Sequence, residues 1–203
     1  MKVLAGCEES AVVREAFAKR GHEVLSADLN PTRIPGPHYE GDVFDVIDYP
    51  WDMGLFFFPC TNSSVSGAKH FARKKMDGSF YASNSLWLYG WKRAEHIRHV
   101  SFEHPVSVIA TLFKKSDMII QPWMYGHYET KQTCLWTRGL PPLVPTYKSV
   151  EECAEALGIP RGTPLTARVH MMTPDRPGEE GKRAMERSKT YPGIAKAMAE
   201  QWG

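Results

Sequence analysis

Residues 2–28, KVLAGCEESAVVREAFAKRGHEVLSAD, decide the fold class of this chain. The run Lys2–Gly6 predicts a short buried strand, and residues 11–20 have the apolar spacing of a helix. Residues 23–27 predict a second strand that ends at Asp28. A strand, a tight turn, a helix and a strand in this order predict a right-handed βαβ unit, which opens an α/β fold.

The remaining chain first continues the α/β pattern and then changes. Residues 52–58 are apolar throughout, as expected of a central parallel strand that is covered on both faces. The other predicted elements are a loop at 61–80, a helix at 83–99, a strand at 100–102, antiparallel strands at 118–120 and 133–136, and helices at 149–157 and 194–202. We expect a single domain over residues 1–203, with a small extension around 121–187.

The length and composition of the chain are typical of a globular protein. It has 203 residues, 42% of them hydrophobic, and a net charge of +2, so its total charge does not point to a polyanionic partner. No apolar run approaches the ~20 residues of a membrane span, and no export signal is recognisable at Met1. We therefore expect a cytosolic protein without membrane contact. Its four cysteines form no C-x-x-C pair and no zinc-ligand spacing, which predicts free thiols and no metal site.

The turn after the first predicted strand has the layout of a nucleoside site. With Ser10 as the predicted N-cap, it places Gly6 and Glu8 near a helix N-terminus, and Asp28 ends the next strand, where an acid can bind ribose hydroxyls. It lacks the G-x-G-x-x-G of dinucleotide sites, so a nucleoside without phosphates, S-adenosylmethionine above all, fits better. Asp42 could accept a hydrogen bond from an adenine amino group. Alternatively, the first pattern is only the start of an ordinary α/β protein, and Asp42 lies in a simple turn.

Cys60 and Glu103 each follow a predicted interior strand, so we expect them to meet at one edge of the sheet. A thiolate can add to carbon 6 of a pyrimidine, which makes carbon 5 nucleophilic, and a carboxyl at ring nitrogen 3 can stabilise the charge that develops. The alternative is a buried cysteine beside a carboxylate that has only a structural role.

The whole chain resembles the short, mostly phage-encoded homologues of the DNA (cytosine-5) methyltransferases. FFFPCTNSSVSG (56–67) resembles the nucleophile loop of the family, and FEHPVSVI (102–109) resembles its Glu-Asn-Pro/Val segment. Residues 4–31 resemble the cofactor-binding start, and GDVFDV (41–46) a further cofactor segment. Residues 119–146 and 187–202 are similar to stretches typical of the phage subgroup, and all these segments come in the expected order.

The resemblance implies a Rossmann-like, S-adenosylmethionine-dependent methyltransferase sheet, with helices on both faces, that acts on a cytosine flipped out of DNA. Cys60 would be the nucleophile and Glu103 the acid. The cofactor-binding residues would be Gly6, Glu8, Asp28, Asp42 and Pro59, and the segment 191–193 would pack beside the cofactor.

The chain departs from the pattern of the family at three positions. Phe58 stands where the family has the first proline of Pro-Pro-Cys, and His104 stands where it has asparagine. Ala11 occupies a turn position where the family usually has glycine. These departures leave two alternatives open: a related pyrimidine-modifying enzyme with another donor or base, or a non-catalytic phage protein that binds nucleic acid or a nucleotide.

A basic cluster follows the nucleophile, at Lys69, Arg73, Lys74 and Lys75. We expect these side chains and Arg168 to hold DNA phosphates, although a solvated surface would have the same composition. The chain has no room for a large recognition domain, so we expect weak sequence selectivity.

Overall fold

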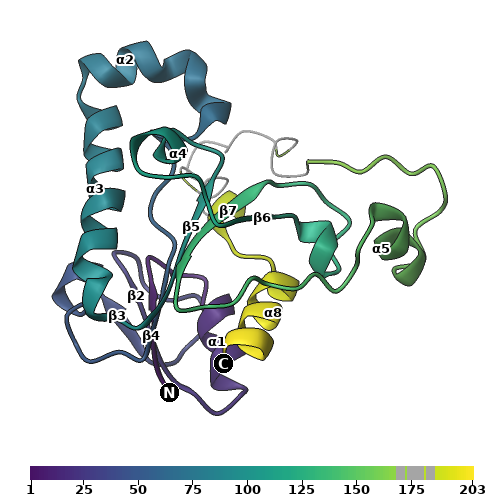
Figure 1. Cartoon of the computed structure of the whole chain (residues 1–203), viewed down its shortest axis with the longest axis horizontal. Helices are drawn as coiled ribbons and strands as arrows, with labels where there is room; N and C mark the ends of the chain where they lie inside the picture. Colours follow the sequence, from purple (N-terminus) through teal and green to yellow (C-terminus); the bar gives the residue numbers. More distant parts are fainter. Residues whose placement is uncertain (168–171, 173–180, 182–185) are drawn as a thin grey trace.

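The computed structural model describes residues 1–167, 172, 181 and 186–203. At the centre of this part of the chain is a seven-stranded sheet with the strand order β3-β2-β1-β4-β5-β7-β6 (Figure 1). The strands are β1 (Lys2–Gly6), β2 (Glu23–Asp28), β3 (His38–Glu40), β4 (Met53–Phe56), β5 (His99–Pro105), β6 (Met118–Ile120) and β7 (Thr133–Arg138). The helices are α1 (Val12–Ala18), α2 (Phe71–Met76), α3 (Ser79–Arg93), α4 (Ile109–Leu112), α5 (Val150–Ala156) and α8 (Pro192–Trp202), with 3₁₀ turns η1 (Val43–Asp45), η2 (Val65–His70), η3 (Ala94–His96) and η4 (Pro122–Tyr125).

The order of the strands reverses beside β1. This strand pairs in parallel with β2 on one side and with β4 on the other, and β5 continues the parallel sheet beyond β4. Only β7 runs antiparallel to its neighbours β5 and β6 among the described strands. In open α/β sheets, ligands bind beyond the carboxyl ends of the strands at such a reversal point. The sheet therefore presents its candidate site where β1, β2, β4 and β5 end.

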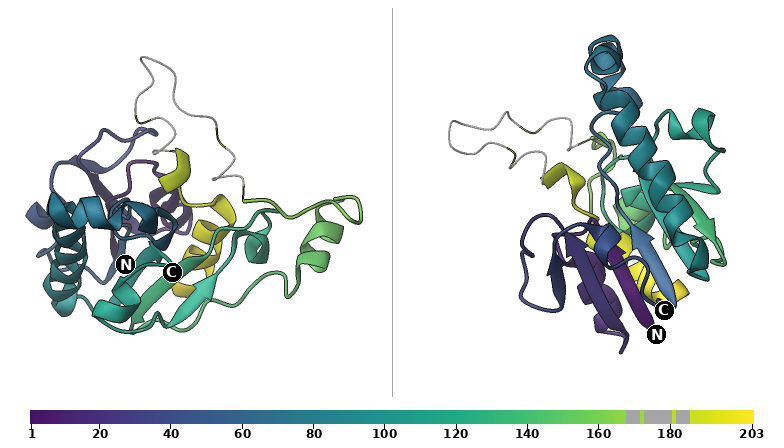
Figure 2. Two further views of the ribbon diagram at one scale, coloured as in Figure 1. Left: turned by 90° about the horizontal axis from the view of Figure 1, so that it is seen from above. Right: turned by 90° about the vertical axis from the view of Figure 1, so that its left-hand side faces the viewer.

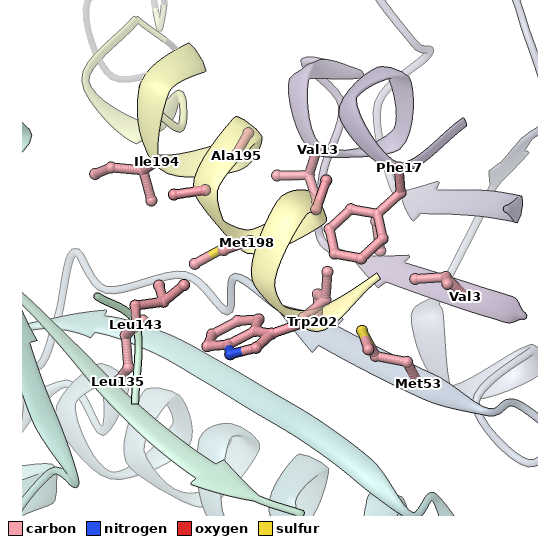
Figure 3. Packing of buried hydrophobic residues seen from close by; sticks show 14 of the residues in the cluster. Val3, Val13, Phe17, Met53, Leu135, Leu143, Ile194, Ala195, Met198 and Trp202 are labelled. Atoms are coloured by element: carbon pink, nitrogen blue, oxygen red, sulfur yellow. The ribbon is translucent and has the colours of Figure 1, made fainter. Parts of the chain in front are cut away.

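Two layers of helices cover the sheet because successive side chains of each strand point to opposite faces. Val3 of β1 belongs to the core under α1 and α8, whereas its neighbour Leu4 belongs to the core under α3. Figure 3 shows the first core, in which Met198 and Trp202 of α8 pack between α1 and the sheet. The helix α8 is thus part of the main core and holds the end of the chain against the sheet.

Helix α3 carries α2 at its end, away from the body of the molecule (Figure 2). The segment 61–80, predicted as a loop, is largely helical, and α3 begins at Ser79 rather than at residue 83 and ends at Arg93. The reason is tertiary packing: the rings of Phe71 and Phe80 lie 5.1 Å apart and fix α2 against the start of α3. Such contacts between residues nine apart are invisible in the polar composition of the segment.

Both ends of the described chain lie beside His22. The terminal nitrogen of Met1 is 3.4 Å from His22 Nδ1, and a Cβ placed on Gly203 would lie 2.6 Å from His22 Nε2. Residue 22 immediately precedes β2, so the two ends lie at the amino-end edge of the sheet, opposite the candidate site (Figure 1).

Candidate functional site

The turn after β1 is built around the carboxylate of Glu8. Its Oε1 accepts hydrogen bonds from the Val12 N–H (3.0 Å) and from the hydroxyl of Ser10. The N-cap of α1 is Ala11, in the left-handed conformation with φ 63°, and not Ser10 as predicted. A left-handed backbone costs a non-glycine residue roughly 1–2 kcal/mol. Ala11 keeps this conformation because its side chain is fully buried and Glu8 anchors the first turn of the helix.

Glu8 retains one unused oxygen. Its Oε2 is buried and has no hydrogen-bond partner among the described residues. Burial raises the pKa of this carboxyl to about 7, although the hydrogen bonds from Ser10 and the α1 backbone act in the other direction. A buried carboxylate oxygen without a partner is unfavourable by roughly 1–3 kcal/mol. It is therefore suited to a ligand that brings a hydrogen-bond donor or a positive charge.

Asp28 and Asp42 face the same turn from neighbouring segments. Burial is the main cause that raises the pKa of the Cys7 thiol, and the two carboxylates add to it, so both lie near this sulfur. Oδ1 of Asp28 accepts from the backbone and side chain of Asn30, both at 2.9 Å, and Asp42 is exposed and caps η1. Gly6 has a packing role, since a Cβ there would lie 2.6 Å from the Phe56 ring. The predicted cofactor residues of β1, β2 and residue 42 thus converge on one turn.

An arginine network closes the loop beside this turn. Arg14 is fully buried, and its guanidinium donates to the carbonyl of Ile34 (2.6 Å). Arg33 pairs with Glu9 through two contacts of 2.5 and 2.8 Å, and it also pairs with Glu186. The sequence analysis did not find this network, which ties residues near both ends of the chain to the loop 30–37.

Cys60 lies in a tight turn beyond β4. Its carbonyl oxygen accepts from the N–H groups of Ser63 (3.1 Å) and Ser64 (3.0 Å), and its side chain is partly exposed. Pro59, the remaining predicted cofactor residue, is exposed just before it. Cys60 as a whole residue is thus partly exposed, although burial is the main influence on its thiol.

Glu103 lies on β5, next to the strand that leads to Cys60. In the sheet, Phe102 of β5 is paired with Phe56, the last residue of β4. Glu103 therefore lies one residue beyond the end of this pairing. Burial raises the pKa of Glu103, and Lys131 and a hydrogen bond from Thr133 partly oppose this shift. The net shift is upward, which favours the protonated acid.

Cys60 and Glu103 share one electrostatic environment. Burial raises the pKa of the Cys60 thiol, the charge of Glu103 raises it further, and Lys131 and Arg187 lower it. Lys131, which the sequence pattern does not predict as a site residue, lowers the pKa of both groups. It lies in a loop without regular periodicity, so only the fold could place it there.

A narrow pocket adjoins Glu103. It has room for about one water molecule, and its lining residues are Phe57, Glu103, Lys131, Thr133, Ser188, Thr190, Tyr191, Ile194 and Met198. The segment that ends at Tyr191 closes the pocket: the Tyr191 hydroxyl donates to Glu129 (2.7 Å), and the Gly193 N–H donates to His127 (2.9 Å). This segment was expected beside a cofactor, and the structure places it over the acid. Cys60 is not part of the lining.

Phe58 and His104, two of the departures from the family pattern, point away from this pocket. The Phe58 ring is buried and stacks on Phe102. The buried imidazole of His104 has Nδ1 3.3 Å from the carbonyl of Pro105, and its Nε2 is 3.2 Å from the Ser63 hydroxyl. Burial lowers the pKa of His104 to about 4, so the imidazole is neutral at physiological pH. Both residues therefore support the Cys60 turn on the side that faces away from the pocket.

The basic cluster after Cys60 divides into two kinds of residue. Lys69, Arg73 and Lys75 are exposed on η2 and α2, as nucleic-acid contacts must be. Lys74 is buried, and its Nζ donates to the carbonyl of Thr61 at 2.5 Å, so the prediction of a phosphate contact does not fit this position. Arg168 lies outside the described residues.

Within the part of the chain that the structure describes, no helix is long and apolar enough to cross a membrane.

Comparison with known proteins identifies the fold. No family model and no curated protein sequence matches the chain. Among solved structures, the Entamoeba histolytica methyltransferase EhMeth is similar with a TM-score of 0.50 and 13% sequence identity, over 73% of this chain and 57% of that chain. The present chain thus spans less than two thirds of that protein. At this identity the similarity concerns the fold, and it confirms the predicted Rossmann-like methyltransferase sheet flanked by helices.

Proposed function

We propose that this protein is an S-adenosylmethionine-dependent DNA cytosine C5-methyltransferase. The observation that carries the proposal is the shared environment of Cys60 and Glu103, which lie at the carboxyl ends of the adjacent strands β4 and β5. A partly exposed thiol and a carboxyl that favours its protonated form are the two groups that addition to a pyrimidine requires. The methyltransferase fold supports the same reaction class.

The residues around the turn after β1 suit the methyl donor. When bound, S-adenosylmethionine supplies an electrophilic methyl group on a sulfonium sulfur. The unpaired Oε2 of Glu8 would accept from its α-ammonium group, Asp28 would accept from ribose hydroxyls, and Asp42 would accept from the adenine amino group. Gly6 and Pro59 would border the ligand through backbone and ring surface.

The chemistry of this chain begins at the Cys60 thiolate. Its sulfur forms a bond to carbon 6 of the cytosine, and the electrons of the 5,6 double bond move to carbon 5, while the Glu103 proton is shared with ring nitrogen 3. With the donor bound, carbon 5 would bond to the methyl group as the methyl–sulfonium bond breaks, and the electron pair of that bond would stay on the donor sulfur, which becomes a neutral thioether. Loss of the carbon-5 proton to water and departure of the Cys60 sulfur with its electron pair restore the double bond and regenerate the thiolate, and the proton on ring nitrogen 3 returns to Glu103.

Lys131 and Arg187 favour the thiolate form of Cys60, because both lower its pKa, while burial and Glu103 hold that pKa above its ordinary value. A cytosine ring is much larger than the pocket beside Glu103, so this pocket has to widen before a flipped base can reach the acid.

The test combines methyl transfer with covalent trapping. The protein is incubated with duplex DNA and radiolabelled S-adenosylmethionine, and the labelled nucleoside is identified; a 5-fluorocytosine duplex is used to trap the adduct. We expect 5-methylcytosine and an adduct with the wild type, neither with Cys60→Ala, and both with Cys153→Ala, a buried cysteine away from the site. Undiminished methylation by Cys60→Ala would refute covalent catalysis.

A non-catalytic binding protein remains the second candidate, because the pocket at Glu103 is closed over in this structure. Cofactor-dependent DNA binding without any adduct would favour it. An enzyme with another base or donor is the third candidate, and Phe58 and His104, which motivate it, lie outside the lining of the pocket beside Glu103. Mass spectrometry of the treated nucleosides would still detect any other added mass.

A further inference from the structure

Among Lys69, Arg73, Lys74 and Lys75, Lys74 is the residue whose ammonium group points into the protein. Only 7% of its surface is exposed, whereas Arg73 and Lys75 on either side of it in α2 are exposed. An ammonium group leaves water only at a cost of several kcal/mol unless a partner receives it. The partner here is the carbonyl oxygen of Thr61, at 2.5 Å, in the residue directly after Cys60.

The space for the Lys74 ammonium group lies within the nucleophile loop itself. A Cβ placed on Gly67 would be 3.6 Å from Lys74 Nζ and 3.8 Å from the Thr61 oxygen, which is ordinary contact distance. The lysine therefore spans from α2 back across η2 to the turn. Its reach is set by α2, which Phe71 and Phe80 hold in place.

The contact fixes the turn at a second point. The Cys60 carbonyl is already held by the N–H groups of Ser63 and Ser64. With Lys74 on the next carbonyl, the peptide groups on both sides of the Thr61 Cα have defined directions, and the first of these groups is bonded directly to the Cys60 Cα, which carries the thiol. Misplacing a reacting group by about 1 Å can reduce a rate by ~10²-fold.

We propose that Lys74 is a positioning residue that holds the Cys60 sulfur in its reactive place and makes no contact with DNA phosphates. The proposal rests on the proposed role of Cys60 as the nucleophile. In this proposal the basic residues of α2 have different roles. Arg73 and Lys75 bind the nucleic acid, whereas Lys74 fixes the position of the Cys60 turn relative to α2.

The experiment compares Lys74→Met, which has similar length but no donor, with Lys74→Arg, which keeps a donor, with Arg73→Met, at a neighbouring predicted phosphate contact, and with Lys19→Met, at the exposed C-cap of α1, as the surface control. Three quantities are measured for each: the rate of adduct formation at saturating 5-fluorocytosine duplex, the slope of log binding constant against log salt concentration, and the rate at which iodoacetamide alkylates Cys60, with Cys7 as internal reference.

For Lys74→Met we expect the saturated trapping rate to fall about 10–100-fold with an unchanged salt slope, and we expect Lys74→Arg to recover most of the rate. Arg73→Met should reduce the slope by about 0.9, as expected for one lost phosphate contact, and Lys19→Met should leave both the slope and the saturated rate intact. A reduced salt slope in Lys74→Met, together with a saturated trapping rate equal to that of the wild type, would overturn the proposal.

Alkylation separates this proposal from the proposed function. If the wild type forms no adduct, the methyltransferase proposal fails, but a changed alkylation rate of Cys60 with an unchanged rate at Cys7 in Lys74→Met still supports positioning. Equal Cys60 alkylation rates in Lys74→Met and the wild type would overturn it. Should Lys74→Met fail to fold, Lys74→Leu, which likewise lacks a donor, takes its place, and the same outcomes decide.

Discussion

Glu103 is the residue on which the acid step of the proposed reaction depends. Its carboxyl lines the narrow pocket, receives a hydrogen bond from Thr133 and has a raised pKa because it is buried. Glutamine would keep the shape and the hydrogen-bonding capacity but could not share a proton with the ring.

We therefore expect Glu103→Gln to slow adduct formation on 5-fluorocytosine DNA by about 10²–10⁴-fold, the usual range for a lost general acid. Quench-flow trapping would measure this rate. The exposed Glu95→Gln serves as the control and should react as the wild type does. If Glu103→Gln trapped DNA at the wild-type rate, Glu103 would not be the acid.

His104 predicts a specific pH dependence of stability. Its folded pKa is lowered to about 4 from 6.5, so between these values the unfolded chain binds a proton that the native protein does not. The free energy of unfolding contributed by this group is complete above pH 6.5. It is lost as the pH falls towards 4, by up to about 1.4 kcal/mol per pH unit.

His104→Gln should remove this contribution while its amide still reaches Ser63. Urea unfolding at pH 7, 6 and 5 would give the free energies of both proteins. We expect the wild type to lose more stability than His104→Gln over this range. Parallel curves for the two proteins would show that His104 is not a buried neutral imidazole.

The individual site residues differ in how far the sequence could predict them. Cys60 and Glu103 could be predicted because each directly follows an apolar run that reads as an interior strand, and the sheet then brings them together. Lys131 and the inward turn of Lys74 could not. A loop lysine and a helix lysine have the same local signal as any solvated cation, and only tertiary packing determines where their side chains point.

At the scale of single elements, α3 carries a glycine whose replacement has opposing effects. Alanine is favoured over glycine in a helix by about 1 kcal/mol. However, a Cβ on Gly90 would lie 2.4 Å from the Phe58 ring, which packs in the core just before the Cys60 turn. Overpacking of this kind typically costs about 1–3 kcal/mol.

We expect packing to prevail, so that Gly90→Ala lowers the melting temperature and also slows adduct formation through Phe58. Ser85→Ala, at an exposed position of the same helix, should leave both unchanged. Differential scanning calorimetry and trapping would measure the two effects. A higher melting temperature for Gly90→Ala would mean that the ring moves aside freely.

Elements with strong apolar patterns were predicted well, and elements made by long-range contacts were not. The strands β1 and β6 match their predicted bounds, and α5 and α8 differ from theirs by one or two residues at their ends. The three-residue strand β3 was missed because its hydrogen bonds to β2 define it, with no periodicity of its own. Helix α2 was missed for a similar reason, since aromatic contacts outweigh its polar composition.

For the molecule as a whole, Arg33 connects segments distant in the sequence. It pairs with Glu9, which is buried, and with Glu186, which is half exposed. Replacing Arg33 leaves the buried Glu9 carboxylate without its ionic partner. Removing the charge of Glu186 affects only the more exposed ion pair between Glu186 and Arg33.

Arg33→Met should therefore destabilise the protein by about 1–3 kcal/mol, as for a buried group that loses its partner. Glu186→Gln should cost less than about 1 kcal/mol, as expected for an exposed ion pair. Guanidinium unfolding of both variants gives the comparison. Equal losses would mean that the link to residue 186, and not the burial of Glu9, stabilises the network.

The position of both chain ends at His22 makes the protein a candidate for circular permutation. A short glycine-serine linker could join residue 203 to residue 1 without crossing the candidate site, because both lie at the opposite edge of the sheet. New ends opened near residue 158, in the exposed turn after α5, would leave the β1–β4 reversal uncut. Tags or reporter domains attached at residues 1 and 203 should likewise stay clear of an incoming duplex.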